Sequence, residues 1–266
     1  MAILQTIELK RYFGDTRAVD NVNLSVNEGE FVSLVGPNGA GKTSLINVIT
    51  AHLKAGSGKI LFQGRDITDL SVTERVRLGI ARSFQLVNVF DDLSAFDNVA
   101  LAIFSREGKT AHLSALAHRD HAVIAEADDI LSQFGLAAKR DDNARDLSQG
   151  ERKLLDVALA YALKPKLLFL DEPTSGVSTR NKAAIMDTIA SVVRGRGITA
   201  VIVEHDMDVV FKYSDRIVVM AQGTVMAQGT PDEIRSNEQV AMALLGTSGP
   251  AAFDQHSLPQ SGPQKG

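Results

Sequence analysis

The stretch GPNGAGKTS, residues 36–44, decides the fold of this chain. It matches the pattern GxxxxGK[ST], with Gly36, Gly41, Lys42 and Thr43 at the fixed positions. The apolar run EFVSLV before it is typical of a buried strand, and SLINVITAHL after it has helical periodicity. A strand, a glycine-rich loop and a helix in this order predict a site for the phosphates of a nucleotide.

Each residue type in this loop has a chemical reason to be there. Glycines let backbone N–H groups curl around an anion, and the helix that follows adds the positive end of its dipole. We expect Lys42 to reach the outer phosphates and the Thr43 hydroxyl to bind Mg²⁺. The alternative is a glycine-rich turn before an ordinary helix, which is disfavoured because the GKT ending and the flanking elements both fit.

A second motif, LLFLDEP at residues 167–173, ends an apolar run in two acids. A buried strand of a parallel sheet delivers such carboxylates to the sheet edge where ligands bind. We expect Asp171 to hold Mg²⁺ and Glu172 to polarise the attacking water. Alone, the motif could equally be a strand that ends in a solvated turn, but Lys42 and Thr43 upstream favour the catalytic interpretation.

A third motif, LSQGE at residues 147–151, supports two interpretations. Ser148 and Glu151 form S-x-x-E before a helical run, which is the pattern of a capping box. Gly150 also opens the backbone at a helix start that could receive a phosphate. We expect both interpretations to hold together.

These motifs resemble those of the ATP-binding cassette ATPases, the nucleotide-binding subunits of ABC transporters. GPNGAGKTS is similar to the family's Walker A motif, LLFLDE to its Walker B motif and LSQGE to its signature motif. The resemblance covers about residues 3–245. It implies an α/β fold: a P-loop NTPase core with a mostly parallel sheet, an N-terminal antiparallel β-subdomain and a helical subdomain at about residues 87–162. The ATPase domain would span residues 1–245.

Three further residues gain a role only through this resemblance. Gln85 in ARSFQ is similar to the Q-loop glutamine, His205 in VIVEHD to the switch histidine, and Phe13 to the aromatic residue that stacks on adenine. Taken alone, Gln85 is a polar loop residue, His205 a strand-end histidine beside an Asp206 helix cap, and Phe13 a core residue.

The resemblance therefore implies a complete set of site residues. Catalysis would use Glu172, His205 and Gln85, and Mg²⁺ would be held by Thr43, Gln85 and Asp171. The residues expected to contact ATP are Phe13, Gly36, Asn38, Gly39, Ala40, Gly41, Lys42, Thr43, Ser44, Ser148, Gln149 and Gly150.

Residues 79–102 resemble, more narrowly, the Q-loop region of the branched-chain amino acid transporter ATPases, which carry an R-[ST]-F-Q core. This implies an importer subunit at the cytoplasmic face of the inner or plasma membrane. Its partners would be membrane permeases, a second ATPase subunit across an ATP-dependent dimer and, indirectly, a periplasmic solute-binding protein. The alternative is a soluble, non-transport cassette ATPase that acts as an assembly or scaffold factor.

Two stretches near these motifs leave questions open. Ser178 stands where most family members have the D-loop Asp, which puts the contact of that Asp between subunits in doubt. After Gln85, a run of apolar residues could face a docked permease helix or could pack in the core. These residues are Leu86, Val87, Val89, Phe90, Leu93 and Phe96.

Composition narrows the function classes. The 266 residues carry 28 basic and 32 acidic side chains, a net charge of −4, which disfavours a nucleic-acid partner. There are no cysteines, so disulfides and thiolate metal sites are excluded. No run approaches the 18 apolar residues of a membrane span, and residues 1–14 lack the centre of a signal peptide, so we expect other chains to form any pore.

Two remaining features have simpler explanations. His118 and His121 lie one helical turn apart, near His112, but no carboxylate completes a metal set, so a solvated face is favoured. Residues 246–266 are rich in Gly, Pro, Ser and Gln, a composition that predicts a disordered tail. Since such a tail cannot repay its ordering entropy, we expect its deletion to change the thermal midpoint and ATPase rate little.

Overall fold

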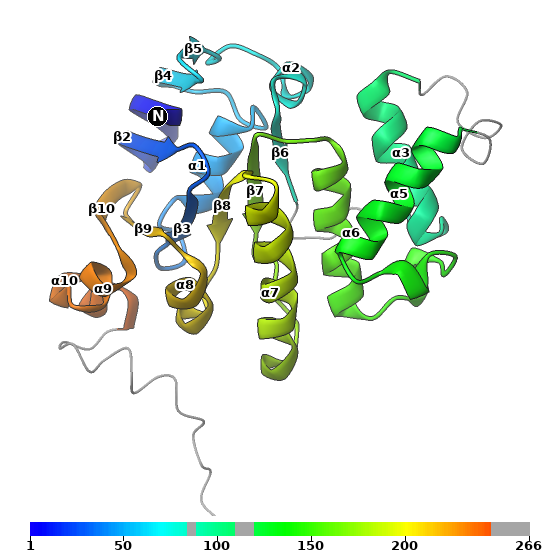
Figure 1. The fold of residues 1–266 in the computed structure, drawn as a ribbon. Helices are drawn as coiled ribbons and strands as arrows, with labels where there is room; N and C mark the ends of the chain where they lie inside the picture. Colours follow the sequence, from blue (N-terminus) through cyan, green and yellow to red (C-terminus); the bar gives the residue numbers. More distant parts are fainter. Residues whose placement is uncertain (84–88, 110–119, 246–266) are drawn as a thin grey trace, which may run out of the picture.

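The computed structural model describes residues 1–83, 89–109 and 120–245 (Figure 1). Two sheets organise these residues, one in the strand order β2-β1-β4-β5 and a larger one in the order β10-β9-β3-β8-β7-β6. The strands are β1 Ala2–Phe13, β2 Thr16–Asn27, β3 Phe31–Val35, β4 Ser57–Phe62, β5 Arg65–Asp66, β6 Ile80–Arg82, β7 Leu167–Asp171, β8 Thr199–Val203, β9 Arg216–Ala221 and β10 Thr224–Gly229.

The larger sheet is mostly parallel, as the sequence predicts. Five strands run parallel to one another, in the order β9, β3, β8, β7 and β6. The edge strand β10 runs antiparallel to β9. Every residue of β3, β7 and β8 is buried, because helices and the second sheet cover both faces. Parallel pairing aligns Asp171 with Val203, so the carboxyl ends of β7 and β8 meet at one edge.

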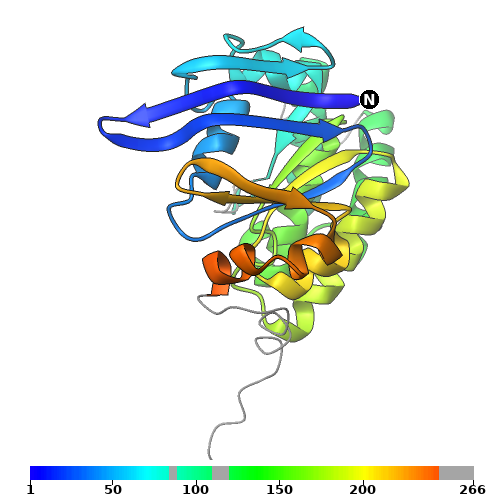
Figure 2. The ribbon, with the colours of Figure 1, turned by 90° about the vertical axis from the view of Figure 1, so that its left-hand side faces the viewer.

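The smaller sheet is antiparallel and holds the amino terminus (Figure 2). Strand β2 alternates buried and exposed residues along much of its length, as expected when one face packs on a core and the other meets solvent. Its buried side chains share one apolar cluster with the first helix and the larger sheet, including Val22, Ile46 and Val203. The cluster therefore packs the antiparallel sheet against α1 and the 36–44 loop.

Helices surround the larger sheet, and three of them gather beyond β6 and β7 (Figure 1). These three are α3, α5 and α6, within the segment predicted as a helical subdomain. The helices are α1 Lys42–Ile49, α2 Val72–Leu78, α3 Ala95–Glu107, α5 His121–Gln133, α6 Gln149–Ala162, α7 Thr179–Gly195, α8 Met207–Tyr213, α9 Pro231–Arg235 and α10 Glu238–Leu245. None of the described helices is both long enough and apolar enough to span a bilayer.

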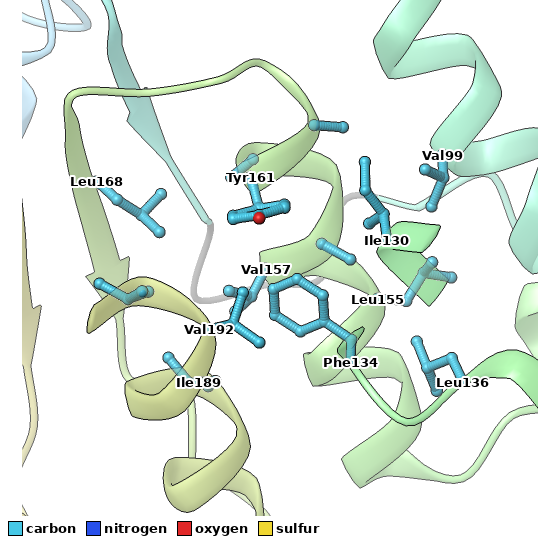
Figure 3. Close-up of a cluster of buried hydrophobic side chains, with 14 of the residues drawn as sticks. Val99, Ile130, Phe134, Leu136, Leu155, Val157, Tyr161, Leu168, Ile189 and Val192 are labelled. Carbon is cyan, nitrogen blue, oxygen red and sulfur yellow. The ribbon is translucent and has the colours of Figure 1, made fainter. Parts of the chain in front are cut away.

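Helix α6 joins the helical group to the sheet through a shared core (Figure 3). Leu155 and Tyr161 of α6 are buried in the cluster that contains Leu168 of β7 and Phe134, the residue that follows α5. The rings of Phe134 and Tyr161 meet edge to face, 5.4 Å between centroids. Because one core serves both regions, a movement of α6 must be felt by β7 and the site at its end.

Helix α1 differs from its predicted extent. It begins at Lys42 and ends at Ile49, whereas the periodic run extends to Leu53. The buried guanidinium of Arg75 explains the early end, because it donates to the carbonyls of Val48 (2.8 Å) and Ile49 (2.5 Å). Those carbonyls would otherwise accept from the next helical turn.

Several predicted features lie outside the described residues. They are Gln85 with Leu86 and Val87, His112 and His118, and the tail at residues 246–266.

Candidate nucleotide site

The loop between β3 and α1 closes so tightly that two of its positions require glycine. Gly41 has φ +99°, and a Cβ atom there would lie 2.1 Å from the carbonyl oxygen of Ala18. A Cβ atom at Gly36, φ +152°, would lie 2.2 Å from the carbonyl oxygen of Met220. The loop is therefore held between β2 and β9, with its backbone turned in a way that side chains forbid.

The first turn of α1 is suited to an anion. Its N-cap residue, Gly41, supplies no capping side chain, and no acidic residue lies in the first turn. The Lys42 ammonium donates to the carbonyls of Gly36 (2.7 Å) and Pro37 (3.1 Å) inside the loop. Burial lowers the pKa of Lys42, while the carboxylates of Glu172 and Asp171 act in the opposite direction. Helix N–H groups and a buried cation thus converge on one space.

Glu172 and His205 meet across the ends of β7 and β8. His205 Nε2 lies 2.9 Å from Glu172 Oε1. The Glu172 backbone has φ +48°, unusual for a residue with a side chain, and its N–H donates to the Val203 carbonyl (2.9 Å). The sheet edge thereby fixes a carboxylate and an imidazole side by side.

Two residues that the sequence analysis did not select hold this pair in place. Glu204 is buried and accepts from the Thr174 hydroxyl (2.7 Å) and from the His205 N–H (3.2 Å). Lys153 of α6 is also buried and donates to the Glu172 carbonyl (3.2 Å). The available signal for Glu204 was an acid that directly follows the apolar run of β8, as acids follow the apolar run 167–170.

The 36–44 loop and the Glu172–His205 pair line a cleft of about 940 Å³. The structure brings into it ten of the predicted site residues: Phe13, Asn38, Gly39, Ala40, Gly41, Lys42, Thr43, Ser44, Glu172 and His205. The sequence analysis missed a second group of lining residues from the start of β2 and the β9–β10 turn: Thr16, Arg17, Ala18, Asp20, Gln222 and Thr224. A backbone hydrogen bond from Asp20 to Gly223 (2.8 Å) joins these two segments.

Phe13 lies at the rim of this cleft. Its side chain is 45% exposed, so its assignment to the core, made from the residue alone, is wrong. The guanidinium of Arg11 lies 4.8 Å from the ring centroid. An exposed ring beside a cleft leaves a flat apolar face available to a ligand.

Asp171 is almost completely buried, with 2% exposure, and pairs with Arg82. No group of three His, Cys, Asp or Glu residues arranged to hold a metal occurs within residues 1–83, 89–109 and 120–245. One carboxylate and the Thr43 hydroxyl nevertheless fit Mg²⁺, which usually takes one or two protein oxygens and completes its shell with water and phosphate.

Ser148, Gln149 and Gly150 do not line the cleft. They begin α6, where the predicted capping box is present: the Ser148 N–H donates to Glu151 Oε2 (2.8 Å) and Ser148 Oγ accepts from the Glu151 N–H (3.3 Å). Ser148 and Gln149 are exposed. Within a single chain, this turn is therefore open to something other than the chain's own nucleotide cleft.

The apolar run after Gln85 divides between the two predicted environments. Phe96 is fully buried, and Val89 packs partly buried against the larger core. Phe90, by contrast, is 57% exposed. Its backbone is fixed by Asn98, which accepts from the Phe90 N–H (2.8 Å) and donates to its carbonyl (3.1 Å).

Comparison with known proteins adds independent evidence. The family model described as ABC transporter matches residues 19–175. A probable branched-chain amino acid transport ATP-binding protein, LivG of Archaeoglobus fulgidus, is 35% identical over 248 residues, 92% of this chain and 96% of that protein. The high-affinity branched-chain amino acid transport ATP-binding protein LivG of Escherichia coli K12 is 34% identical over 250 residues, 92% of this chain and 98% of that protein.

Solved structures agree. An ATP-binding cassette of an ABC transporter in its ADP conformation has a TM-score of 0.82 and 31% identity, covering 93% of this chain and 100% of that one. A dimeric post-hydrolysis cassette with ADP and Pi has a TM-score of 0.72 and 26% identity, covering 86% and 98%. The family match, the identity along most of the chain and the phosphate-binding loop lead to one conclusion: this chain belongs to the ABC transporter family, as an ATP-binding and ATP-hydrolysing subunit.

Proposed function

We propose that this chain powers an importer of branched-chain amino acids or similar small molecules, working on permease subunits at the cytoplasmic face of the membrane. The observation that carries the proposal is the cleft in which the 36–44 loop faces the Glu172–His205 pair. The solute class follows the names of the relatives that align along nearly the whole chain.

ATP would bind with its adenine on the Phe13 ring and its phosphates at the start of α1. The Lys42 ammonium would exchange the carbonyls of Gly36 and Pro37 for phosphate oxygens, which form stronger, charge-assisted hydrogen bonds. Backbone N–H groups of the loop residues Asn38, Gly39, Ala40, Gly41 and Ser44 complete the proposed cradle.

Mg²⁺ would be held by Thr43, Asp171 and Gln85, and when bound it would neutralise charge that develops on the phosphates. Glu172 would orient the attacking water and accept its proton at the carboxylate. His205, in contact with that carboxylate, would hold it in place and donate toward the phosphate. Gln85 completes the proposed set from the segment after β6.

A second ATPase subunit would supply the remaining contacts. Ser148, Gln149 and Gly150 do not line the chain's own cleft, which supports a head-to-tail dimer in which this turn faces the partner's ATP. Ser178, at the position of the usual D-loop Asp, caps α7 without a side-chain hydrogen bond to the helix. The proposal gives Ser178 no contact between subunits.

Phe90 is the residue best placed to receive a permease. It is exposed, held rigidly by Asn98, and separated by four residues from Gln85. An exposed aromatic on a fixed backbone is a typical anchor for a partner helix. The link to a periplasmic solute-binding protein would then be indirect, through the permeases.

The proposal is tested by reconstituting the chain in proteoliposomes with the permease subunits of a branched-chain amino acid importer. Phe90→Ser should keep basal ATPase activity but lose membrane recruitment and leucine uptake into proteoliposomes. Ile7→Ser, at another exposed apolar residue, is the matched control and should behave as wild type. Normal recruitment of Phe90→Ser would remove the docking assignment. Absence of any membrane association in the wild type would favour a non-transport role.

A further inference from the structure

A buried arginine connects the two structural elements that carry the proposed magnesium ligands. Arg82, the last residue of β6, is placed with its side chain 8% exposed between α1 and β7. Its Nη2 donates to Asp171 Oδ2 at 2.6 Å, and its Nη1 donates to Asn47 Oδ1 at 2.5 Å. One planar guanidinium therefore fixes a helix and a strand relative to each other.

The two partners are significant because of where they lie. Asn47 is four residues after Thr43, so the two share one face of α1. Asp171 is the final residue of β7. A shift of α1 against β7 would separate the Thr43 hydroxyl from the Asp171 carboxylate, and the Arg82 fork resists that shift.

We propose that Arg82 is a positioning residue that sets the spacing of the magnesium ligands Thr43 and Asp171. The inference rests on the proposed role of these two residues toward Mg²⁺. Arg82 itself does not line the candidate nucleotide cleft. It acts through Asp171, whose carboxylate it orients, and through Asn47, whose helix it anchors.

The ion pair between Arg82 and Asp171 can persist when Mg²⁺ binds. A carboxylate has about four lone-pair sites, so the bond at Oδ2 is compatible with a metal or a metal-bound water on the same group. Breaking the pair would leave a buried charge uncompensated at Asp171. Side chains that orient a metal ligand in this way raise metal affinity without binding the metal.

A second buried arginine provides a matched control. Arg75 also contacts the last turn of α1, through the carbonyls of Val48 and Ile49, which follow Asn47 directly. It donates as well to the carbonyl of Thr68 (2.7 Å). Arg75 is buried and contacts α1, as Arg82 does, but it contacts no proposed metal ligand. Substitution of Arg75 therefore measures the effect of losing a buried arginine–helix contact alone.

The experiment measures binding of mant-ADP to the full-length chain, in EDTA and during a MgCl₂ titration. We expect Arg82→Lys to raise the Mg²⁺ concentration for half-maximal effect by about tenfold or more, because an ammonium cannot span both partners. Affinity in EDTA should stay near the wild-type value. Asn47→Ala should shift the titration in the same direction by a smaller factor, and Arg75→Lys should not shift it.

The outcomes separate this inference from the function on which it rests. If Asp171→Asn loses the Mg²⁺ effect while Arg82→Lys and Asn47→Ala match Arg75→Lys, Arg82 is only structural and the inference is overturned. If Asp171→Asn keeps the full effect, the proposed metal role itself fails, and the inference fails with it. Thermal midpoints identify variants that do not fold, and if Arg82→Lys is one of them, the folded Asn47→Ala variant decides.

Discussion

The starts of helices α1 and α6 look alike in sequence and differ in chemistry. Both contain a glycine that the sequence analysis linked to phosphate. Helix α1 starts at Gly41 with no capping side chain and no acid in its first turn. Helix α6 starts at Ser148, whose side chain and Glu151 satisfy each other's backbone N–H groups. Side chains fill two backbone donors at the start of α6, Ser148 and Glu151, whereas no side chain caps the start of α1.

The comparison shows which features make a helix terminus an anion-binding site. The dipole is present in both helices, and it favours negative charge by less than about 1 kcal/mol at an exposed end. Helix α1 adds a buried cation, Lys42, and a backbone that glycine alone can adopt. At the start of α6, by contrast, the Glu151 carboxylate accepts from the Ser148 N–H. Under the proposed function, this start serves a nucleotide that a second subunit presents.

The largest predicted effect is on the rate of ATP hydrolysis, at the cleft formed by the start of α1 and the Glu172–His205 pair. Glu172→Gln keeps the shape of the side chain but removes its charge, so hydrolysis should fall by roughly 10²–10⁴-fold. ATP affinity should change little, because binding depends on α1. A phosphate-release assay and a nucleotide titration measure the two separately. Hydrolysis near the wild-type rate would show that another group orients the water.

The next effect concerns the backbone of the α1 start. Gly41→Ala should destabilise the fold by about 1–3 kcal/mol and weaken ATP binding, because its Cβ would meet the Ala18 carbonyl at a positive φ. Gly39→Ala is the control, since it has a positive φ, +79°, but no atom within 4 Å of an added Cβ. Urea unfolding of both variants measures the difference. Equal losses would mean that the close contact with Ala18 is unimportant.

A smaller effect is expected at α6. Ser148→Ala removes the N-cap and should cost about 1 kcal/mol of the free energy of unfolding. Thr230→Ala, at the capping box of α9, is a matched control away from the proposed dimer surface. Both variants should lose similar stability, and only Ser148→Ala should lower ATPase activity of the assembled transporter. Loss of activity in both would point to destabilisation alone.

The smallest effect is a pH dependence of that same cap. The Ser148 hydroxyl holds the pKa of Glu151 below its ordinary value, against the opposing effect of burial. A carboxyl with a lowered folded-state pKa stabilises the fold above its unfolded-state pKa, about 4.3, and loses this contribution as pH falls through the folded-state value. The stability difference between wild type and Ser148→Ala should therefore be full at pH 7 and shrink below about pH 4. A constant difference down to pH 3 would contradict the role of Glu151.

Local patterns account for the parts of the fold that the sequence predicts. The 36–44 loop, the buried strand 167–171 and the Ser148–Glu151 cap each depend on residues a few positions apart. These features can therefore be predicted from the sequence alone. The same holds for β2, whose alternation of buried and exposed residues reports one buried face.

The missed features depend on residues that meet only after folding. Arg82 is 35 residues from Asn47 and 89 from Asp171, so no local pattern reports their contact. Arg75 ends α1 from 26 residues away, which periodicity within the helix cannot show. Glu204 acts through Thr174 on a neighbouring strand end. Tertiary packing decides each of these positions.

Calorimetric titration of the isolated chain with ATP and Mg²⁺ tests the contrast between the two helix starts most directly. Lys42→Ala removes charge-assisted bonds worth about 3 kcal/mol, so the dissociation constant should rise roughly 100-fold. Ser148→Ala should leave it unchanged, because Ser148 does not line the chain's own cleft. A comparable loss of affinity in both variants would contradict the account, since it would place the α6 start in the same single-chain site as α1.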